Sequence, residues 1–243
     1  MKSGKISVQS ENIFPIIKKF LYSEQEIFLR ELVSNAVDAT NKLKALSNRG
    51  EAKGELNNLN IEIIPNKEAH TLTIRDRGLG MDAEEVDKYL NQVAFSSAQE
   101  FLDKFKNELN IIGHFGLGFY SAFMVSDKVE VITKSYKENA TAVKWTCIGD
   151  TDYSIEDIEK SERGTDIVLH LSEDARDYED LGKLETLLEK FCKFLPIPIQ
   201  LGTKKEKIKE GDQEVEIEVP NIINNTDPLW RKTPNDITEE QYK

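Results

Sequence analysis

Cysteine and long apolar runs are scarce in this chain of 243 residues, and each scarcity excludes a class of protein. The two cysteines, Cys147 and Cys192, cannot supply the disulfide framework of a small secreted domain. Low cysteine use fits a reducing compartment, so we expect a cytoplasmic protein. The N-terminal segment from Met1 to Ser7 has no apolar stretch, and no secretory signal is predicted. No apolar run approaches the length of a membrane span, so no membrane partner is expected.

An excess of positive charge is also missing. The chain has 32 Lys and Arg residues against 44 Asp and Glu residues, which gives a formal net charge of −12. Non-specific binding to nucleic acid needs Lys and Arg to displace counterions, so no nucleic-acid partner is expected. The 3 histidines lack metal-ligand spacing with cysteine or acid, and the pattern of a P-loop nucleotide site does not occur.

The hydrophobic content of 39% is enough for a sizeable core, in one large domain or in one domain plus part of another. The composition changes after Gly202, because Lys and Glu dominate the stretch from Lys204 to Glu218. This stretch reads as a solvated linker or a hairpin. We therefore predict a first domain over residues 1–205. Residues 206–243 are then a charged linker and the truncated start of a further unit.

Short alternating segments and longer apolar-periodic segments both occur, so the sequence predicts both strands and helices. Ser23 with Glu26 and Asp82 with Glu85 have the spacing of N-terminal capping boxes. The predicted helices cover 11–22, 27–46, 82–93, 98–105, 119–125 and 181–195, and the predicted strands cover 5–9, 61–64, 71–76, 129–134, 141–147, 165–171 and 197–201.

The helix predicted from Ile27 to Leu46 is apolar around much of its circumference and should therefore be buried. Glu31, Asn35, Asp38 and Lys42 follow one another at steps of four, three and four residues, so they form one polar stripe. Buried polar groups are costly unless they are paired, and a charged ligand with a metal ion is one possible partner. The alternative is a row of ordinary surface charges.

Two glycine clusters accompany this helix. The first is Gly78-Leu-Gly80, which follows Asp76 at the end of a predicted strand, and the second spans Gly113 to Gly118. Each is a weak signal alone, because Asp-x-Gly is a common turn and G-x-x-G-x-G is not the dinucleotide order. Together with the polar stripe, they are explained by nucleotide binding.

Each part of such a site has a chemical reason. A carboxylate such as Asp76 can accept from the exocyclic amine of adenine, and glycine backbone N–H groups can donate to phosphate oxygens. Asn35 offers a hard oxygen ligand to Mg²⁺, which also bridges the phosphates. Glu31, one turn away, could orient and deprotonate a water for attack on the terminal phosphorus.

Four runs resemble the signature blocks of the heat-shock-protein-90 chaperones: 28–38, 75–81, 112–121 and 163–165. Two further runs, 224–230 and 236–240, resemble the opening of the middle domain of that family. The short charged stretch and the plain N-terminus are similar to its bacterial form. The resemblance implies the Bergerat-type ATP-binding fold, a two-layer α/β sandwich whose mostly antiparallel sheet has helices on one face.

The resemblance also implies a function. It predicts an ATP-binding and ATP-hydrolysing module of a chaperone, in which ATP closes a lid and drives N-terminal dimerisation to act on client proteins. The expected cofactors and partners are ATP or ADP, Mg²⁺, clients and a second copy, with residues 1–9 exchanged between protomers. An alternative is a nucleotide-gated binding module with negligible hydrolysis, because a middle-domain arginine completes the family site.

Mismatch-repair proteins, type II topoisomerases and histidine kinases share the fold. The acidic charge argues against the DNA enzymes, and the start of a middle domain argues against the kinases.

Carried over residue by residue, the resemblance gives Glu31 as the general base, Asn35 as the Mg²⁺ ligand and Asp76 as the adenine anchor. Thr165 would support Asp76 through a water, and 113–119 would contact phosphates at the end of the lid. The nucleotide-binding set is Asn35, Asp38, Asp76, Gly80, Met81, Gly113, His114, Phe115, Gly116, Leu117, Gly118, Phe119 and Thr165.

One segment departs from the family pattern. After Leu90 the usual Gly-Thr-Ile-Ala-Lys-Ser-Gly is replaced by Asn91-Gln-Val-Ala-Phe95-Ser-Ser97. The family lysine near the phosphates and the glycines that help the lid to hinge are therefore missing. This puts the details of lid closure in doubt, and leaves ATP binding as expected.

Overall fold

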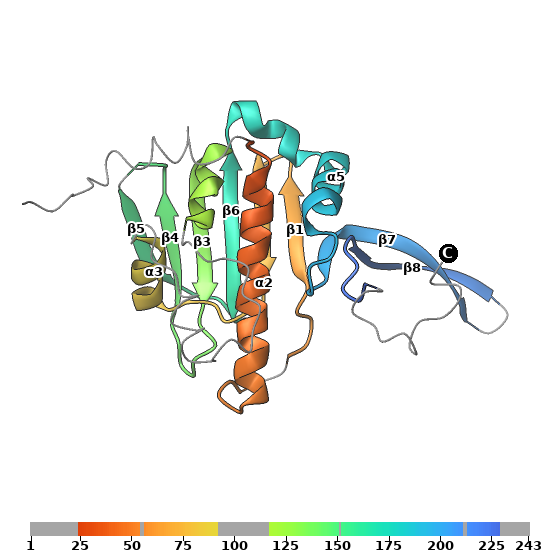
Figure 1. Ribbon diagram of the computed structural model, residues 1–243, viewed down its shortest axis with the longest axis horizontal. Helices are drawn as coiled ribbons and strands as arrows, with labels where there is room; N and C mark the ends of the chain where they lie inside the picture. The colour runs from red at the N-terminus through yellow and green to blue at the C-terminus, as the bar shows by residue number, and fades with distance from the viewer. Residues whose placement is uncertain (1–23, 54–55, 92–116, 151, 211–212, 229–243) are drawn as a thin grey trace, which may run out of the picture.

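A single sheet carries most of the chain, and its strands are largely antiparallel. The computed structural model describes residues 24–53, 56–91, 117–150, 152–210 and 213–228, without the side chains of 208–210 and 213–214. Across these residues the sheet has eight strands in the order β5-β4-β3-β6-β2-β1-β7-β8 (Figure 1). Among the strands that the structure describes, β1 and β7 alone pair in parallel. The strands are β1 Ile61–Asn66, β2 Thr71–Asp76, β3 Ser126–Lys134, β4 Ala142–Cys147, β5 Tyr153–Ile158, β6 Gly164–Leu171, β7 Ile199–Glu210 and β8 Gln213–Ile222.

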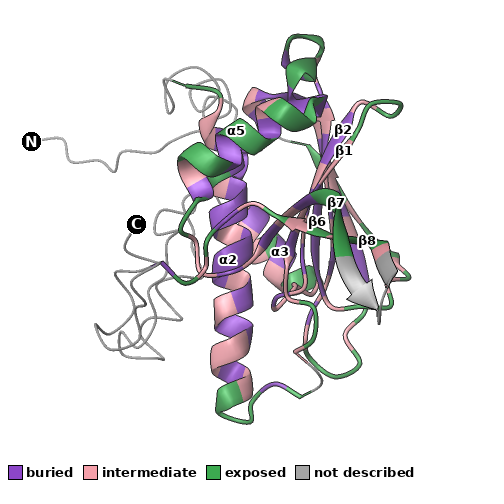
Figure 2. Cartoon of the chain, turned by 90° about the vertical axis from the view of Figure 1, so that its right-hand side faces the viewer, coloured by how far each residue is buried: buried purple, intermediate pink, exposed green. Residues whose placement is uncertain are grey.

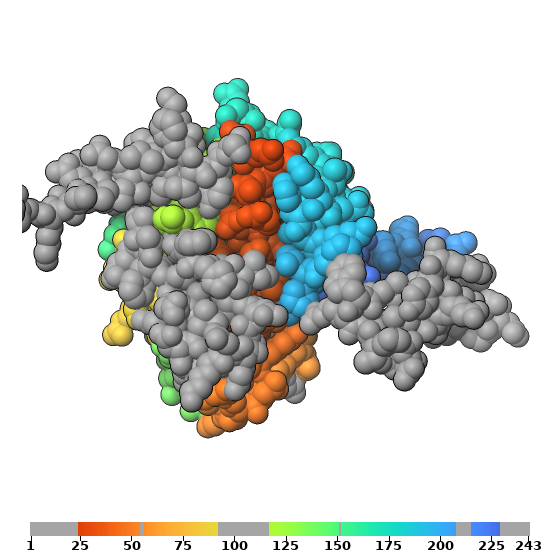
Figure 3. All heavy atoms as spheres, in the orientation of Figure 1, coloured from red at the N-terminus to blue at the C-terminus, as the bar shows by residue number. Residues whose placement is uncertain are grey.

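The helices cover one face of this sheet (Figure 2). The longest, α2, runs along the sheet and lies beside α5 on the helical face (Figure 3). The result is a two-layer α+β sandwich, as the sequence predicts. None of these helices is long and apolar enough to cross a membrane. The α-helices are α2 Ile27–Asn48, α3 Ala83–Leu90 and α5 Leu181–Cys192, and the 3₁₀ segments are η3 Gly118–Met124 and η4 Glu173–Glu179.

The core lies between the two layers and follows from alternation in the strands. Leu72 and Ile74 of β2 point toward α2, and both are almost fully buried, whereas Arg75 between Ile74 and Asp76 points the other way. The helix itself is buried on several sides, because Phe28 and Leu32 as well as Val33 and Val37 are 0% exposed. The prediction of a helix that is apolar around much of its circumference is therefore confirmed.

The two predicted capping boxes have different outcomes. Asp82 caps α3 as expected, because its side chain accepts from Glu85 N and its own N–H donates to the Glu85 carboxylate. Ser23, the other predicted cap, lies outside the described residues; the described helix α2 begins at Ile27, with Glu26 before it and no side-chain cap at Glu26. The Glu26 carboxylate accepts from Lys190 of α5 at 3.0 Å.

Several elements differ from the sequence prediction. The segment after Gly118 is a 3₁₀ helix, and neither β5 nor η4 is predicted. The charged stretch is a hairpin of β7 and β8, in which Lys205 opposes Glu218 and Lys207 opposes Glu216. The predicted domain boundary after residue 205 falls inside β7. The predicted elements 5–9, 11–22 and 98–105, and most of the unusual segment 91–97, lie outside the described residues.

Candidate nucleotide site

Asp76 ends β2 on the face of the sheet that α2 covers. It is 6% exposed, and its Oδ1 accepts from Gly78 N at 2.8 Å. A second backbone donor is the N–H of Thr165, the residue opposite Asp76 on β6. Two N–H groups can hold a carboxylate in place and still leave lone pairs open, because an ionised carboxylate accepts at about four positions.

Burial sets the charge of Asp76. Desolvation raises the pKa of its carboxyl from 3.8 to about 7, and the charge of Asp166 acts in the same direction. The N–H donors of Gly78 and Thr165 and the Lys160 ammonium oppose this rise in pKa. The carboxyl is therefore balanced between its two protonation states near neutral pH, which is common at functional sites.

A row of polar side chains crosses three strands beside Asp76. Thr165 opposes Asp76, and Thr133 of β3 opposes Thr165. The two hydroxyls lie 3.0 Å apart, and Thr133 and Thr165 are 0% and 7% exposed. The next row inward, Ile74 and its partner Ile167, is apolar. Sequence reasoning missed Thr133, although the alternation of Val129, Val131 and Thr133 places it on the inner face.

The segment after Asp76 is fixed between α2 and β3. A Cβ on Gly78 would lie 2.7 Å from the carbonyl carbon of Ala39 in α2. Gly80 has a φ of +59°, and a Cβ there would lie 1.8 Å from Lys134 O. No other residue fits at this position, because the left-handed backbone and the close approach both require glycine. Met81 N then donates to Thr133 Oγ1 at 2.9 Å.

The polar stripe of α2 is partly buried. Asp38 and Lys42 are only 6% and 7% exposed, so the alternative of a surface row is wrong for these two residues. Burial lowers the pKa of Lys42, and the charge of Asp38 opposes that change. Glu31 and Asn35 keep partial exposure. Ala39 lies eight residues after Glu31, so Glu31, Asn35 and Ala39 follow one another along α2 at steps of four residues. Ala39 is also partly exposed, and it lies against Gly78.

Glu31 meets the end of the second glycine cluster. A Cβ on Gly118 would lie 2.6 Å from Glu31 Oε2, so the carboxylate directly faces this backbone. Its other oxygen accepts from Arg30 at 2.7 Å. Phe119 is 8% exposed, and its ring packs edge-on against Trp145 in the core. Gly113, His114, Phe115 and Gly116 lie outside the described residues.

The structure thus brings the predicted residues into two groups along α2. One holds Asp76, Gly80, Met81 and Thr165, and the other holds Glu31, Leu117 and Gly118. The line from Ala39 back to Glu31 connects them, over about 12 Å at a rise of 1.5 Å per residue. Asn35 lies midway on this line.

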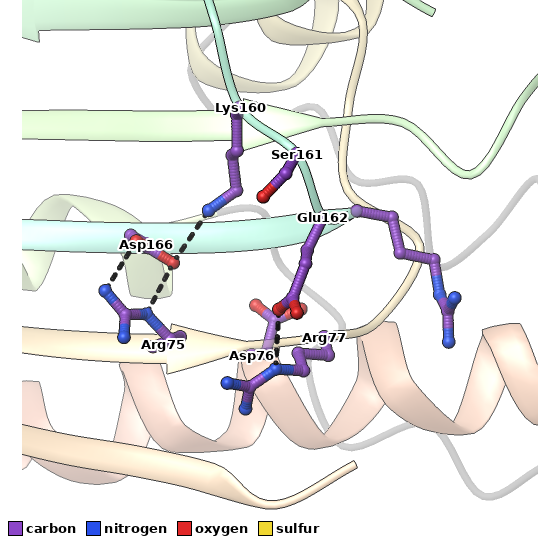
Figure 4. Close-up of a pocket in the computed structure, with 8 residues that line it drawn as sticks. Arg75, Asp76, Arg77, Lys160, Ser161, Glu162 and Asp166 are labelled. Carbon is purple, nitrogen blue, oxygen red and sulfur yellow. Dashed lines mark hydrogen bonds and ion pairs between the residues drawn. The ribbon is translucent and has the colours of Figure 1, made fainter. Parts of the chain in front are cut away.

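A surface pocket of about 100 Å³ lies at the same end of β2 and is a separate feature (Figure 4). Of the residues that line this pocket, Asp76 alone belongs to the predicted nucleotide-binding set. Arg75 and Arg77 alternate with Asp76 and so point to the open face of the sheet. There Arg75 donates twice to Asp166, at 3.0 and 3.1 Å. The pocket is lined by Arg75, Asp76, Arg77, Lys160, Ser161, Glu162, Arg163 and Asp166.

Comparison with known proteins identifies the family. A sequence model described as "Histidine kinase-, DNA gyrase B-, and HSP90-like ATPase" matches residues 22–174. The chain belongs to this ATPase family. It is 58% identical to the Chaperone protein htpG of Bacteroides fragilis (strain 638R), over 244 residues that cover 100% of this chain and 35% of that protein.

More distant HSP90-like relatives agree. The Chaperone protein HtpG of Bacteroides thetaiotaomicron is 55% identical, over 100% of this chain and 35% of that protein. That of Oceanobacillus iheyensis is 37% identical, over 100% of this chain and 40% of that protein. The predicted resemblance to the bacterial heat-shock-protein-90 chaperones is confirmed. The chain spans about a third of the length of these relatives.

Proposed function

We propose that this chain is the ATP-binding and ATP-hydrolysing module of a cytoplasmic molecular chaperone. The observation that supports this most is the arrangement along α2. A buried carboxyl lies at the end of β2, and a second carboxylate faces the glycine backbone at Gly118. The partly exposed line from Ala39 through Asn35 to Glu31 joins them.

The base end of the nucleotide is assigned to the strand ends. Asp76 accepts from the amine of adenine, and Thr165 supports it through a water. The backbone of Gly80 and Met81 lies against the base, because glycine at position 80 lets this segment lie close to Lys134. Asp38 and Lys42 form a buried charged pair farther along α2, beside this end of the site.

The phosphate end is assigned to α2 and the residues from Gly113 to Phe119. Asn35 is a partly exposed amide one turn from Glu31, which fits an oxygen ligand for Mg²⁺. The described residues contain no cluster of three or more His, Cys, Asp or Glu that would hold a metal alone. A single amide fits Mg²⁺, which keeps several waters and binds through phosphates. When bound, the ion would neutralise phosphate charge.

Glu31 is assigned as the general base. Its carboxylate takes the proton of a water whose oxygen attacks the terminal phosphorus, and ADP leaves with the electrons of the broken P–O bond. Gly118 lets the phosphate-binding backbone approach this carboxylate, since a Cβ there would lie 2.6 Å from Oε2 and would displace the Glu31 side chain. Lid closure, N-terminal dimerisation and work on client proteins are assigned to the longer protein, with residues 1–205 as its ATP-binding domain.

Calorimetric titration with ATP and Mg²⁺ tests the binding assignment. Asp76→Asn should weaken binding by at least about a hundredfold, because the amide places N–H donors against the adenine amine. The matched control is Asp166→Asn, on the neighbouring strand but the opposite face, which should bind within about twofold of the wild type. Equal binding by Asp76→Asn and the wild type would refute the adenine anchor.

A second experiment separates binding from hydrolysis. In the longer protein that includes the following domain, Glu31→Ala should bind ATP and lose turnover. Normal turnover by Glu31→Ala would show that the base is misassigned. Turnover of the 243-residue chain should be much lower than that of the longer protein, if a middle-domain arginine completes the site. Equal turnover would favour a self-sufficient ATPase, and the absence of turnover in both would favour the binding module.

A further inference from the structure

Thr133 closes the buried polar row at the strand ends and has three hydrogen-bond partners. Its Oγ1 lies 2.9 Å from Met81 N, 3.0 Å from Thr165 Oγ1 and 3.3 Å from Gly164 O. The residue is 0% exposed. A hydroxyl has one proton and two lone pairs, so three partners saturate it. Its direction is therefore fixed by the surrounding backbone.

The protons of the two hydroxyls are linked. Met81 N–H can only donate to Thr133, so the Thr133 proton goes either to Gly164 O or to Thr165 Oγ1. In the first case, Thr165 donates back to Thr133 and offers only lone pairs to its surroundings. In the second case, the Thr165 proton is released for another acceptor. Thr133 thus sets whether Thr165 is an acceptor or a donor beside Asp76.

Thr133 also belongs to the strand end that holds the segment after Asp76. Tyr136 N donates to Leu79 O at 2.7 Å, Gly80 lies against Lys134 O, and Met81 N donates to Thr133. These three successive residues are therefore fixed on the end of β3. Removal of the Thr133 hydroxyl would leave the Met81 N–H without its partner and would free the Thr165 hydroxyl.

We infer that Thr133 is a positioning residue that makes the site selective for a 6-amino purine over a 6-oxo purine. This inference rests on the proposed function, since it assumes that Asp76 accepts from the base. A 6-amino purine offers a donor amine beside an acceptor nitrogen, which matches Asp76 as acceptor and Thr165 as donor. A 6-oxo purine has the opposite pattern, with an acceptor carbonyl oxygen beside a donor ring N–H. The shorter separation, 3.0 Å to Thr165 Oγ1 against 3.3 Å to Gly164 O, favours the arrangement in which Thr133 gives its proton to Thr165 and so holds Thr165 as the donor.

Binding of ADP and of inosine diphosphate, each with Mg²⁺, tests the inference by calorimetry on the 243-residue chain. Thr133→Val keeps the shape and removes the hydroxyl. It should weaken ADP binding about tenfold and inosine diphosphate binding much less, so that the ratio of the two dissociation constants narrows. Thr133→Ser keeps the hydroxyl and should restore ADP affinity and the ratio to within about threefold of the wild type.

Thr40→Val is the matched control, because Thr40 is also 0% exposed and its hydroxyl bonds to Ala36 O within α2. It should leave the ratio unchanged. Thermal unfolding verifies that each variant is folded, and Thr133→Ala replaces Thr133→Val if that variant does not fold. An unchanged ratio in the folded variant, an equal loss for both nucleotides, or no rescue by serine would overturn the inference. Failure of the wild type to bind either nucleotide would refute the proposed function itself.

Discussion

Asp76 and Arg75 are neighbours in β2, yet they belong to two different polar networks. On the inner face, Asp76 and Thr165 are held by backbone N–H groups and by hydroxyls, which are neutral partners. On the open face, Arg75 pairs with Asp166 and with Glu62 of β1, so each charge has an opposite charge beside it.

The two faces differ in whether their charged groups can still bind a ligand. The charged side chains on the open face form ion pairs with one another, which is typical of a network that stabilises the fold. The inner carboxyl accepts from neutral N–H donors and makes no ion pair with a described residue, although the Lys160 ammonium favours its charged form, so a ligand can still provide a partner. The predictions below alter one face at a time, and one of them uses the electrostatic effect of Asp166 on Asp76 across the sheet.

Gly80→Ala should have the largest effect. The new Cβ would collide with Lys134 O, and the backbone conformation at a φ of +59° would be strained as well. We expect a loss of at least about 5 kcal/mol in unfolding free energy, or no folded protein. The control is Gly202→Ala, because Gly202 has a φ of +66° and open space around its Cα. Its cost should be about 1 kcal/mol, and urea unfolding measures both. Similar losses would show that the close approach to Lys134 does not matter.

The pH dependence of stability should reveal Asp76 next. Its pKa is raised from 3.8 to about 7 in the folded chain, so the folded state binds more protons than the unfolded state between these values. The resulting stability is fully present below pH 4 and is lost as the pH rises to 7, by about 4 kcal/mol. Asp76→Asn cannot titrate and should lack this component. The measurement is the difference in unfolding free energy between the two proteins from pH 4 to pH 8, and a constant difference would contradict it.

Nucleotide binding should respond to pH in the opposite direction. Only the ionised carboxyl accepts from the adenine amine, so ADP affinity should fall as the pH drops below 7, with a slope that approaches about tenfold per unit well below that pH. Titration calorimetry with ADP from pH 5.5 to pH 8 measures this. The Asp166→Asn variant is a useful comparison, because removal of that charge lowers the pKa of Asp76 and should shift the profile to lower pH. Affinity that is flat across this range would argue against Asp76 as the acceptor.

Asp166→Asn should itself have a moderate effect on stability at pH 7. The substitution breaks two hydrogen bonds from Arg75 and one from Lys160 on the open face. The side chain of Arg75 is 36% exposed, so solvent replaces part of the lost interaction. We expect a loss of about 1–2 kcal/mol by urea unfolding at pH 7, with nearly wild-type nucleotide binding. A binding defect as large as that of Asp76→Asn would remove the distinction between the two faces.

Glu162→Gln should have the smallest effect. Its side chain is 66% exposed, and Arg77 keeps its ion pair with Glu62 when Glu162 is neutralised. We expect a change in unfolding free energy of about 0.5 kcal/mol or less. A change above about 1 kcal/mol, seen at low salt and at high salt alike, would show that this exposed pair contributes more than its surroundings suggest.

Local patterns were sufficient for some parts of the fold. The helix from Ile27, the hairpin before Asp76 and the capping box at Asp82 are confirmed, because each depends on residues close together in the chain. The ion pair between Glu26 and Lys190 was not predicted, because the two residues are far apart in the sequence. The edge strand β5 was missed because its pattern of exposure is not a clean alternation.

In the candidate site too, some residues were visible from local sequence patterns and others depended on contacts between distant segments. The sequence by itself indicated Glu31, Asn35 and Asp76, because a helical stripe and an acid before Gly-x-Gly are visible in the order of residues. Thr133 could not be found in this way. Only the strand order β3-β6-β2 and its register align Thr133, Thr165 and Asp76 in one row. Pairing between strands distant in sequence is set by packing of the whole sheet, so tertiary structure alone decided which residues share this buried end.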